Sequence, residues 1–70
     1  MKTILGTRLK ELRIEKGLTQ AQLAQQLNLH CVTYLHYEKE QREPPLSILA
    51  DMALYFQVST DYLLGLTEDY

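Results

Sequence analysis

The stretch from Thr19 to Lys39, TQAQLAQQLNLHCVTYLHYEK, decides the fold, because it predicts two short helices joined by a tight turn. Its first half opens with a strong helix-start signal, in which Thr19 caps the helix and Gln22 reaches back to it as in a capping box. Asn28 then favours a sharp turn, since asparagine adopts positive φ more readily than most residues. We therefore expect one helix to end near Asn28 and the next to begin within three residues of it.

The second helix of this pair, within residues 29–39, has no clear polar face. At about 100° per residue, one side carries Cys31, Val32, Leu35, His36 and Lys39, and the other carries His30, Tyr34, Tyr37 and Glu38. The spacing of Leu29 and Tyr34 is that of a hydrophobic staple, which favours burial of the tyrosine side. Hydrophobicity alone favours burial of Cys31, Val32 and Leu35. The local sequence leaves the buried side undecided.

The flanking residues predict three more helices and no strand. Leu5, Leu9 and Leu12 form an apolar stripe on a helix over 4–16 that Gly17 ends. A fourth helix over 46–56 follows two prolines, and we expect its inward side chains to be Leu46, Leu49, Ala50, Ala53 and Phe56. A short fifth helix runs from a Ser59 cap to Gly65. The expected fold class is all-α, in one domain spanning residues 1–70.

The composition narrows the functional class. The chain has 70 residues, of which 46% are apolar, and its single cysteine excludes an internal disulfide framework and suits the cytoplasm. No apolar run approaches the length of a membrane span. No nucleophile–base pair, phosphate-binding glycine loop or pair of carboxylates is evident, so we do not expect an enzyme or a cofactor.

The charges are unevenly distributed along the chain. The net charge of −2 does not by itself suggest nucleic acid. However, residues 1–42 hold all seven basic residues and four acidic ones, whereas residues 43–70 hold five acidic residues and no basic one. Such asymmetry favours a basic working half and an acidic half kept away from it, although a chance distribution is the simpler reading in a short chain.

Taken together, these segments resemble the Cro/C1-type (XRE) helix-turn-helix family of phage and bacterial repressors. The resemblance rests on the order and spacing of RLKELR at 8–13, LTQ at 18–20, LAxxL at 23–27, YE at 37–38, RxP at 42–44 and VSxDYLLG at 58–65. It implies a compact five-helix, lambda-repressor-like domain whose third helix enters the DNA major groove. It also implies that Tyr34 and Tyr37 face inward and that Arg13 forms an ion pair with Glu38.

The resemblance assigns roles to the residues around the helix pair. The expected phosphate contacts are Thr19, Gln20, Lys39 and Arg42, and the expected base-reading residues are Cys31, Val32, Leu35 and His36. Val32 can contact a thymine methyl group, and His36 can hydrogen-bond a purine edge. The family more often has polar residues at the reading positions and a glycine at position 40, where this chain has Glu40. The alternative is that these side chains merely pack or are solvated.

The leading hypothesis is a DNA-binding transcriptional regulator, a repressor that binds double-stranded DNA as a homodimer on a palindromic operator. The candidate dimer surface consists of Tyr62, Leu66 and Tyr70, with a monomer as the alternative. A different class of function is a protein-interaction module that uses the apolar side of the third helix to bind a protein partner. We expect no metal site, because His30, Cys31 and His36 on one helix cannot converge on an ion.

Overall fold

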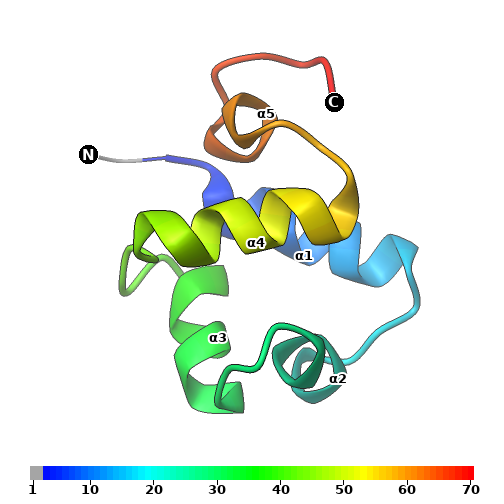
Figure 1. Ribbon diagram of the computed structural model, residues 1–70, viewed down its shortest axis with the longest axis vertical. Helices are drawn as coiled ribbons and strands as arrows, with labels where there is room; N and C mark the ends of the chain where they lie inside the picture. The colour runs from blue at the N-terminus through cyan, green and yellow to red at the C-terminus, as the bar shows by residue number, and fades with distance from the viewer. Residues whose placement is uncertain (1–2) are drawn as a thin grey trace.

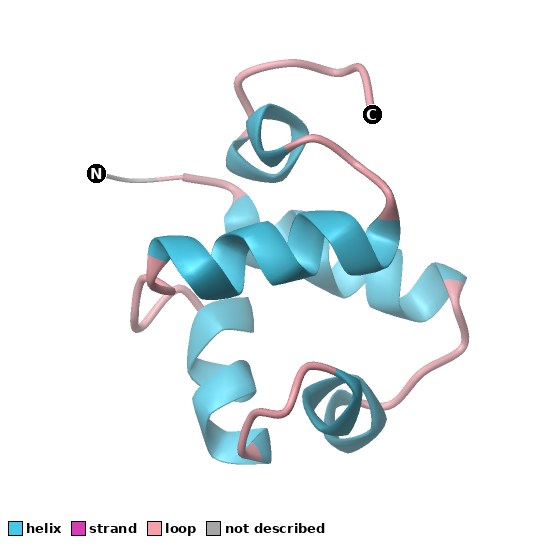
Figure 2. Cartoon of the chain, in the orientation of Figure 1, coloured by secondary structure: helices cyan, strands magenta, loops and turns pink. Residues whose placement is uncertain are grey.

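The computed structural model describes residues 3–70 and contains five helices (Figure 1). They are α1 (Leu5–Glu15), α2 (Gln20–Gln26), α3 (Cys31–Glu38), α4 (Leu46–Phe56) and α5 (Thr60–Leu64). The described residues contain no strand, as Figure 2 shows, so the all-α class is confirmed. None of these helices is long and apolar enough to cross a membrane.

Helix α1 joins the α2–α3 pair to the rest of the domain. In Figure 1, α2 and α3 lie at the bottom, α1 and α4 cross the middle, and α5 lies at the top near the C-terminal end. Helix α1 contacts both α3 and α5, and α4 contacts α5. The buried side chains form one core, which includes the predicted α1 stripe of Leu5, Leu9 and Leu12. The fold therefore presents α2 and α3 at one end of a single packed unit.

A glycine sets how closely α1 approaches α3. A β-carbon added at Gly6 would collide with the backbone carbonyl oxygen of Glu38, in the last turn of α3. Glycine normally weakens a helix interior by roughly 1 kcal/mol relative to alanine. Its presence in the first turn of α1 is explained by this close backbone contact, which fixes the position of the α3 C-terminus.

All five helices end in the same way. One or two residues past the end of each helix lies a residue with a positive φ between 56° and 82°, and these residues are Gly17, Asn28, Glu40, Gln57 and Gly65. The N–H of each donates to the carbonyl three residues earlier, and the following N–H donates to the carbonyl five residues before it. After α3, for example, Glu40 N–H donates to Tyr37 O at 3.2 Å and Gln41 N–H to His36 O at 2.8 Å. This is the Schellman motif, which glycine favours. Glu40 and Gln57 thus adopt the left-handed conformation although neither is a glycine or an asparagine.

The prediction for α4 was partly wrong. Leu49, Ala53 and Phe56 are buried as expected, but Leu46 is 83% exposed and Ala50 is also exposed. Met52, which was not among the expected inward residues, is fully buried. The core face of α4 consists of positions 49, 52, 53 and 56, a regular i, i+3, i+4, i+7 stripe, and Leu46 and Ala50 lie at its edge.

Tyr62 was also predicted wrongly, as an exposed dimer residue. Its side chain is only 7% exposed, because the Arg8 guanidinium lies 4.1 Å above the centroid of its ring. Tyr70 packs edge-on against the same ring at 4.7 Å between centroids, and Arg8 also donates to Glu68 Oε1 at 3.1 Å. Leu66 and Tyr70 remain largely exposed, at 71% and 66%.

Candidate nucleic-acid interface

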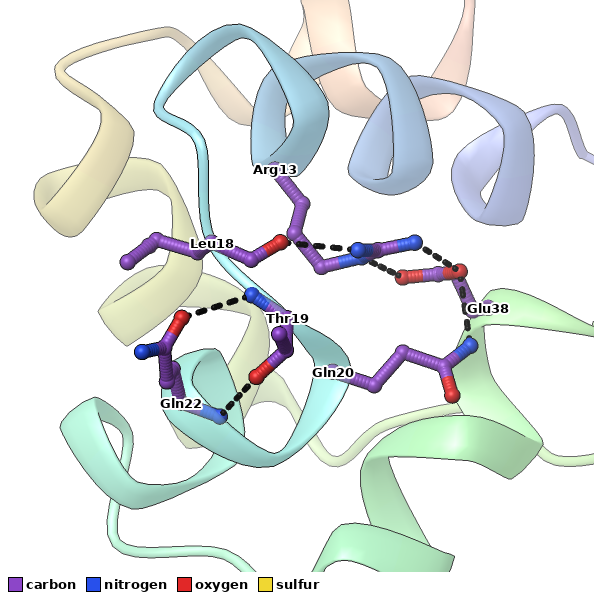
Figure 3. Close-up of polar contacts among 6 residues, drawn as sticks. All are labelled: Arg13, Leu18, Thr19, Gln20, Gln22 and Glu38. Carbon is purple, nitrogen blue, oxygen red and sulfur yellow. Dashed lines mark hydrogen bonds and ion pairs between the residues drawn. The ribbon is translucent and has the colours of Figure 1, made fainter.

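The capping box predicted at the start of α2 is present. Thr19 Oγ1 accepts a hydrogen bond from the Gln22 N–H at 3.1 Å, and Gln22 Oε1 accepts one from the Thr19 N–H at 2.9 Å (Figure 3). These two bonds satisfy donors that a helix N-terminus otherwise leaves unpaired. The Thr19 oxygen is used within the cap, and its hydroxyl hydrogen is left to donate outward.

The ion pair implied between Arg13 and Glu38 is also present, and it ties α1 to α3. Arg13 Nε donates to Glu38 Oε2 at 2.8 Å and Nη2 donates to Oε1 at 3.3 Å, while Nη1 donates to the Leu18 carbonyl at 2.8 Å (Figure 3). The pair is almost completely buried. Buried pairs of this kind contribute to orientation more reliably than to stability. The guanidinium therefore holds α3 and the segment before α2 in one arrangement.

The electrostatics of this cluster keep both charges in place. The hydrogen bonds that Arg13 donates to the Glu38 carboxylate raise the pKa of Arg13. Burial raises the pKa of Glu38, but the hydrogen bonds that it accepts, from Arg13 above all, lower it by more, and the net shift is downward. Tyr34 lies beside them with a buried hydroxyl, and burial together with the Glu38 carboxylate raises the pKa of that phenol. Glu38 is thus an anion and Tyr34 a neutral phenol at neutral pH.

Gln20 has a role that the sequence did not indicate. Its Nε2 donates to Glu38 Oε1 at 3.1 Å, so the first residue of α2 is bound to the last residue of α3 (Figure 3). The side-chain amide that we expected to contact phosphate therefore has one of its two N–H groups engaged within the protein. No sequence signal marks this bond, because it depends on how α2 and α3 meet.

The structure answers which side of α3 is buried. Tyr34 is fully buried and Tyr37 nearly so, whereas Cys31, Val32 and Lys39 are exposed. Val32 is the most prominent apolar group on this surface, at 62% exposure. Leu35 and His36, which were expected to face fully outward, are half-buried. The exposed side of α3 is therefore a narrow apolar surface with one lysine at its C-terminal end.

The loop after α3 carries charges of both signs. Lys39 and Arg42 are exposed, as the expected phosphate contacts require, but Glu40 lies between them. The Glu40 carboxylate accepts a hydrogen bond from the Thr3 hydroxyl at 2.9 Å. Its negative charge, in the same loop as the two basic residues, lowers the positive potential that this loop can present to an anion.

Comparison with known proteins gives a consistent assignment. A helix-turn-helix family model matches residues 9–63 of the chain. The chain is 44% identical over 62 residues to YobD, an uncharacterized HTH-type transcriptional regulator of Bacillus subtilis strain 168. This match covers 89% of the chain and 55% of YobD. The chain is 42% identical over 64 residues to the HTH-type transcriptional regulator ImmR of the same strain, covering 91% and 50%. The chain spans about half the length of these relatives.

Solved structures share the fold. The P22 c2 repressor, in a crystal structure with synthetic operator 9T, superposes with a TM-score of 0.82 at 27% identity and covers 90% of this chain and 96% of that one. A transcriptional regulator from Listeria innocua superposes with a TM-score of 0.86 at 28% identity, covering 100% and 65%. The arrangement of α2 and α3 is therefore that of solved regulators.

Proposed function

The chain belongs to the Cro/C1-type helix-turn-helix family, and on that premise we propose that it is a sequence-specific DNA-binding transcriptional regulator that acts as a repressor. The observation that carries the proposal is the exposed side of α3, which lies opposite the buried tyrosines and is held beside α2 by the Arg13–Glu38–Gln20 cluster. The fold that this chain shares with the P22 c2 repressor, solved with its operator, supports the same reading.

In this proposal α3 enters the major groove, and its exposed side chains contact base edges. Val32 contacts a thymine methyl group, since that methyl is the only apolar feature in the groove. Cys31, Leu35 and His36 complete the reading surface. Backbone phosphates are bound by the Thr19 hydroxyl, the second N–H of the Gln20 amide, Lys39 and Arg42.

Two copies bind a two-fold symmetric operator, with their α3 helices in successive major grooves about 34 Å apart. Leu66 and Tyr70, exposed on the α5 side of the domain, are the proposed dimer contacts. In Figure 1 this side lies opposite α2, so a partner copy there would leave the reading surface free. An operator occupied in this way blocks access of polymerase to the promoter.

A protein-interaction module is the second candidate. The exposure of Val32 and the exposed acidic side chain of Glu40 favour it, because an apolar side chain and a carboxylate both suit a protein surface better than a phosphate backbone. Heparin chromatography at moderate salt distinguishes the two. Retention favours DNA binding, and flow-through combined with self-association or capture of a partner favours the module.

Selection from a random duplex library, followed by a salt titration on the selected sequence, tests the proposal. We expect a palindrome, and an affinity that falls steeply between 50 and 200 mM salt, with a slope of about −0.9 per neutralised phosphate. Lys39→Gln should reduce that slope by about one per half-site, while Val32→Ala should leave it unchanged and alter the preferred bases. If no sequence is enriched at low salt, α3 does not bind DNA bases, and the protein-interaction module becomes the favoured function.

A further inference from the structure

We propose that His36 reads a guanine, through an N–H on Nε2 that donates to the acceptor atoms of the guanine major-groove edge. The inference rests on the proposed DNA-binding function and names one base that this function would select. Its starting observation is that the two nitrogens of the His36 ring have different surroundings. Nδ1 is buried and has no hydrogen-bond partner among residues 3–70, whereas Nε2 is not enclosed in this way.

The burial of Nδ1 determines which nitrogen carries the proton. A neutral imidazole has one N–H, and its other nitrogen is an acceptor. A proton on Nδ1 would be a buried donor without a partner, and such orphaned N–H groups are rare in folded proteins. A proton on Nε2 avoids this, because Nε2 is not buried without a partner as Nδ1 is. The surroundings of the ring therefore favour the tautomer that is protonated on Nε2.

That tautomer gives His36 a defined preference among bases. An N–H in the major groove needs an acceptor, and guanine presents two adjacent ones, N7 and O6. Adenine presents one acceptor, N7, beside an amino donor, thymine presents one acceptor, O4, beside its methyl group, and cytosine presents only an amino donor. Guanine is the base whose exposed edge accepts a hydrogen bond at either atom.

The tautomer can be measured directly on the native chain. Long-range proton–nitrogen NMR spectra at a pH where the ring is neutral report which nitrogen of each histidine is protonated. We expect His36 to be protonated on Nε2 alone. His30 is an internal control, because it is exposed at the start of α3 and its side chain makes no capping bond. The measurement needs no DNA, and a proton found on Nδ1 of His36 would overturn the inference.

The base is tested by single-atom replacement in the selected operator. Each guanine is replaced in turn by 7-deazaguanine, which exchanges N7 for a C–H and keeps base pairing. We expect one position in each half-site at which the native chain loses about three- to tenfold in affinity, the effect of one neutral hydrogen bond. His36→Ala should show no loss at that position, and the matched control Val32→Ala should keep the loss.

The outcomes separate this inference from the proposed function. If no duplex is enriched, both the proposed DNA-binding function and the role of His36 are wrong. If an operator is selected but contains no guanine in its half-site, or if no replacement distinguishes the native chain from His36→Ala, only the role of His36 fails. Circular dichroism of His36→Ala shows whether that variant is folded, and the NMR measurement decides the tautomer independently of it.

Discussion

Replacing Glu40 by glycine should stabilise the fold slightly and tighten DNA binding, and Glu40→Gln should separate the two effects. Glu40 occupies the left-handed position of the Schellman motif after α3, with φ at 56°. A residue with a β-carbon is disfavoured there by roughly 1–2 kcal/mol, and glycine is not. Glu40 also lies in the same loop as Lys39 and Arg42, the two exposed basic residues that the proposed function assigns to DNA phosphate.

The expected change in stability is a small difference between opposing effects. Relief of the left-handed conformation contributes about 1–2 kcal/mol. The greater freedom of glycine in the unfolded chain lowers the free energy of unfolding by about 0.5–1 kcal/mol. Loss of the exposed hydrogen bond that Thr3 donates to Glu40 lowers it by about 0.5 kcal/mol more. The net change in the free energy of unfolding should lie between about −0.5 and +1 kcal/mol, with a small gain at the middle of that range, and a gain of about 1 kcal/mol corresponds to roughly 7 °C in Tm for a domain of this size. Glu40→Gln keeps φ and an acceptor oxygen for Thr3, so its stability should stay within about 0.5 kcal/mol of the native chain.

The expected change in DNA affinity comes from charge alone. A carboxylate about 8 Å from a phosphate costs roughly 0.5 kcal/mol in water, which is about twofold in affinity for each half-site. Both variants should therefore bind the selected operator about four- to fivefold more tightly as dimers, and the gain should shrink as salt rises. Thermal unfolding followed by circular dichroism and operator titration followed by fluorescence anisotropy measure the two quantities. If Glu40→Gln raises Tm as much as Glu40→Gly does, the left-handed conformation is not the cause and the reasoning is wrong.

Four further predictions concern other parts of the fold. Gln57→Gly should stabilise by about 0–1 kcal/mol in urea, because Gln57 holds the same left-handed position after α4; a loss of stability would contradict this. Gly6→Ala should destabilise by more than about 2 kcal/mol in the same assay, despite the better helix propensity of alanine, because its β-carbon meets a backbone carbonyl. The pKa of Glu38 is lower in the folded chain than its usual 4.5. The stability that this anion contributes is therefore present above pH 4.5 and is lost as pH falls through the lower folded pKa. In urea unfolding measured at several pH values, Glu38→Gln should lack this loss of stability in acid. Val32→Ala should leave the free energy of unfolding within about 0.5 kcal/mol of the native value, since the side chain is largely exposed. The native chain should bind an operator with thymine about 0.8 kcal/mol more tightly than one with uracil, which lacks the methyl group, and Val32→Ala should abolish this difference in anisotropy titrations.

Features that depend on a few neighbouring residues could be predicted from the sequence. The Thr19 capping box and the Ser59 cap were both confirmed, because each is formed by residues three apart in the chain. The ends of α1, α2 and α5 were marked by Gly17, Asn28 and Gly65. The left-handed residues after α3 and α4 were not marked in this way, because the packing of those helices holds a glutamate and a glutamine in a conformation that their own preference disfavours.

The buried side of α4 could not be chosen in the same manner. Its sequence is apolar nearly all round, so hydrophobic periodicity fits more than one side. Packing against α5 and the common core decides between them, and it buries Met52 while leaving Leu46 in solvent. A side that depends on the position of other helices is not encoded in the eleven residues of α4 alone.

The reading surface depends on the same kind of distant contact, and this is why its chemistry could be proposed only once the fold was known. In residues 29–39 the two sides of the helix were both plausible cores, and Arg13, 25 residues away in the chain from Glu38, selects one of them through their buried ion pair. Turning Glu38 toward α1 turns the tyrosines inward, and Val32 is then left outside. The same turn encloses only one nitrogen of His36. The identity of a proton donor on the exposed side of α3 is therefore a consequence of how its other side is packed, which a motif in the sequence does not contain.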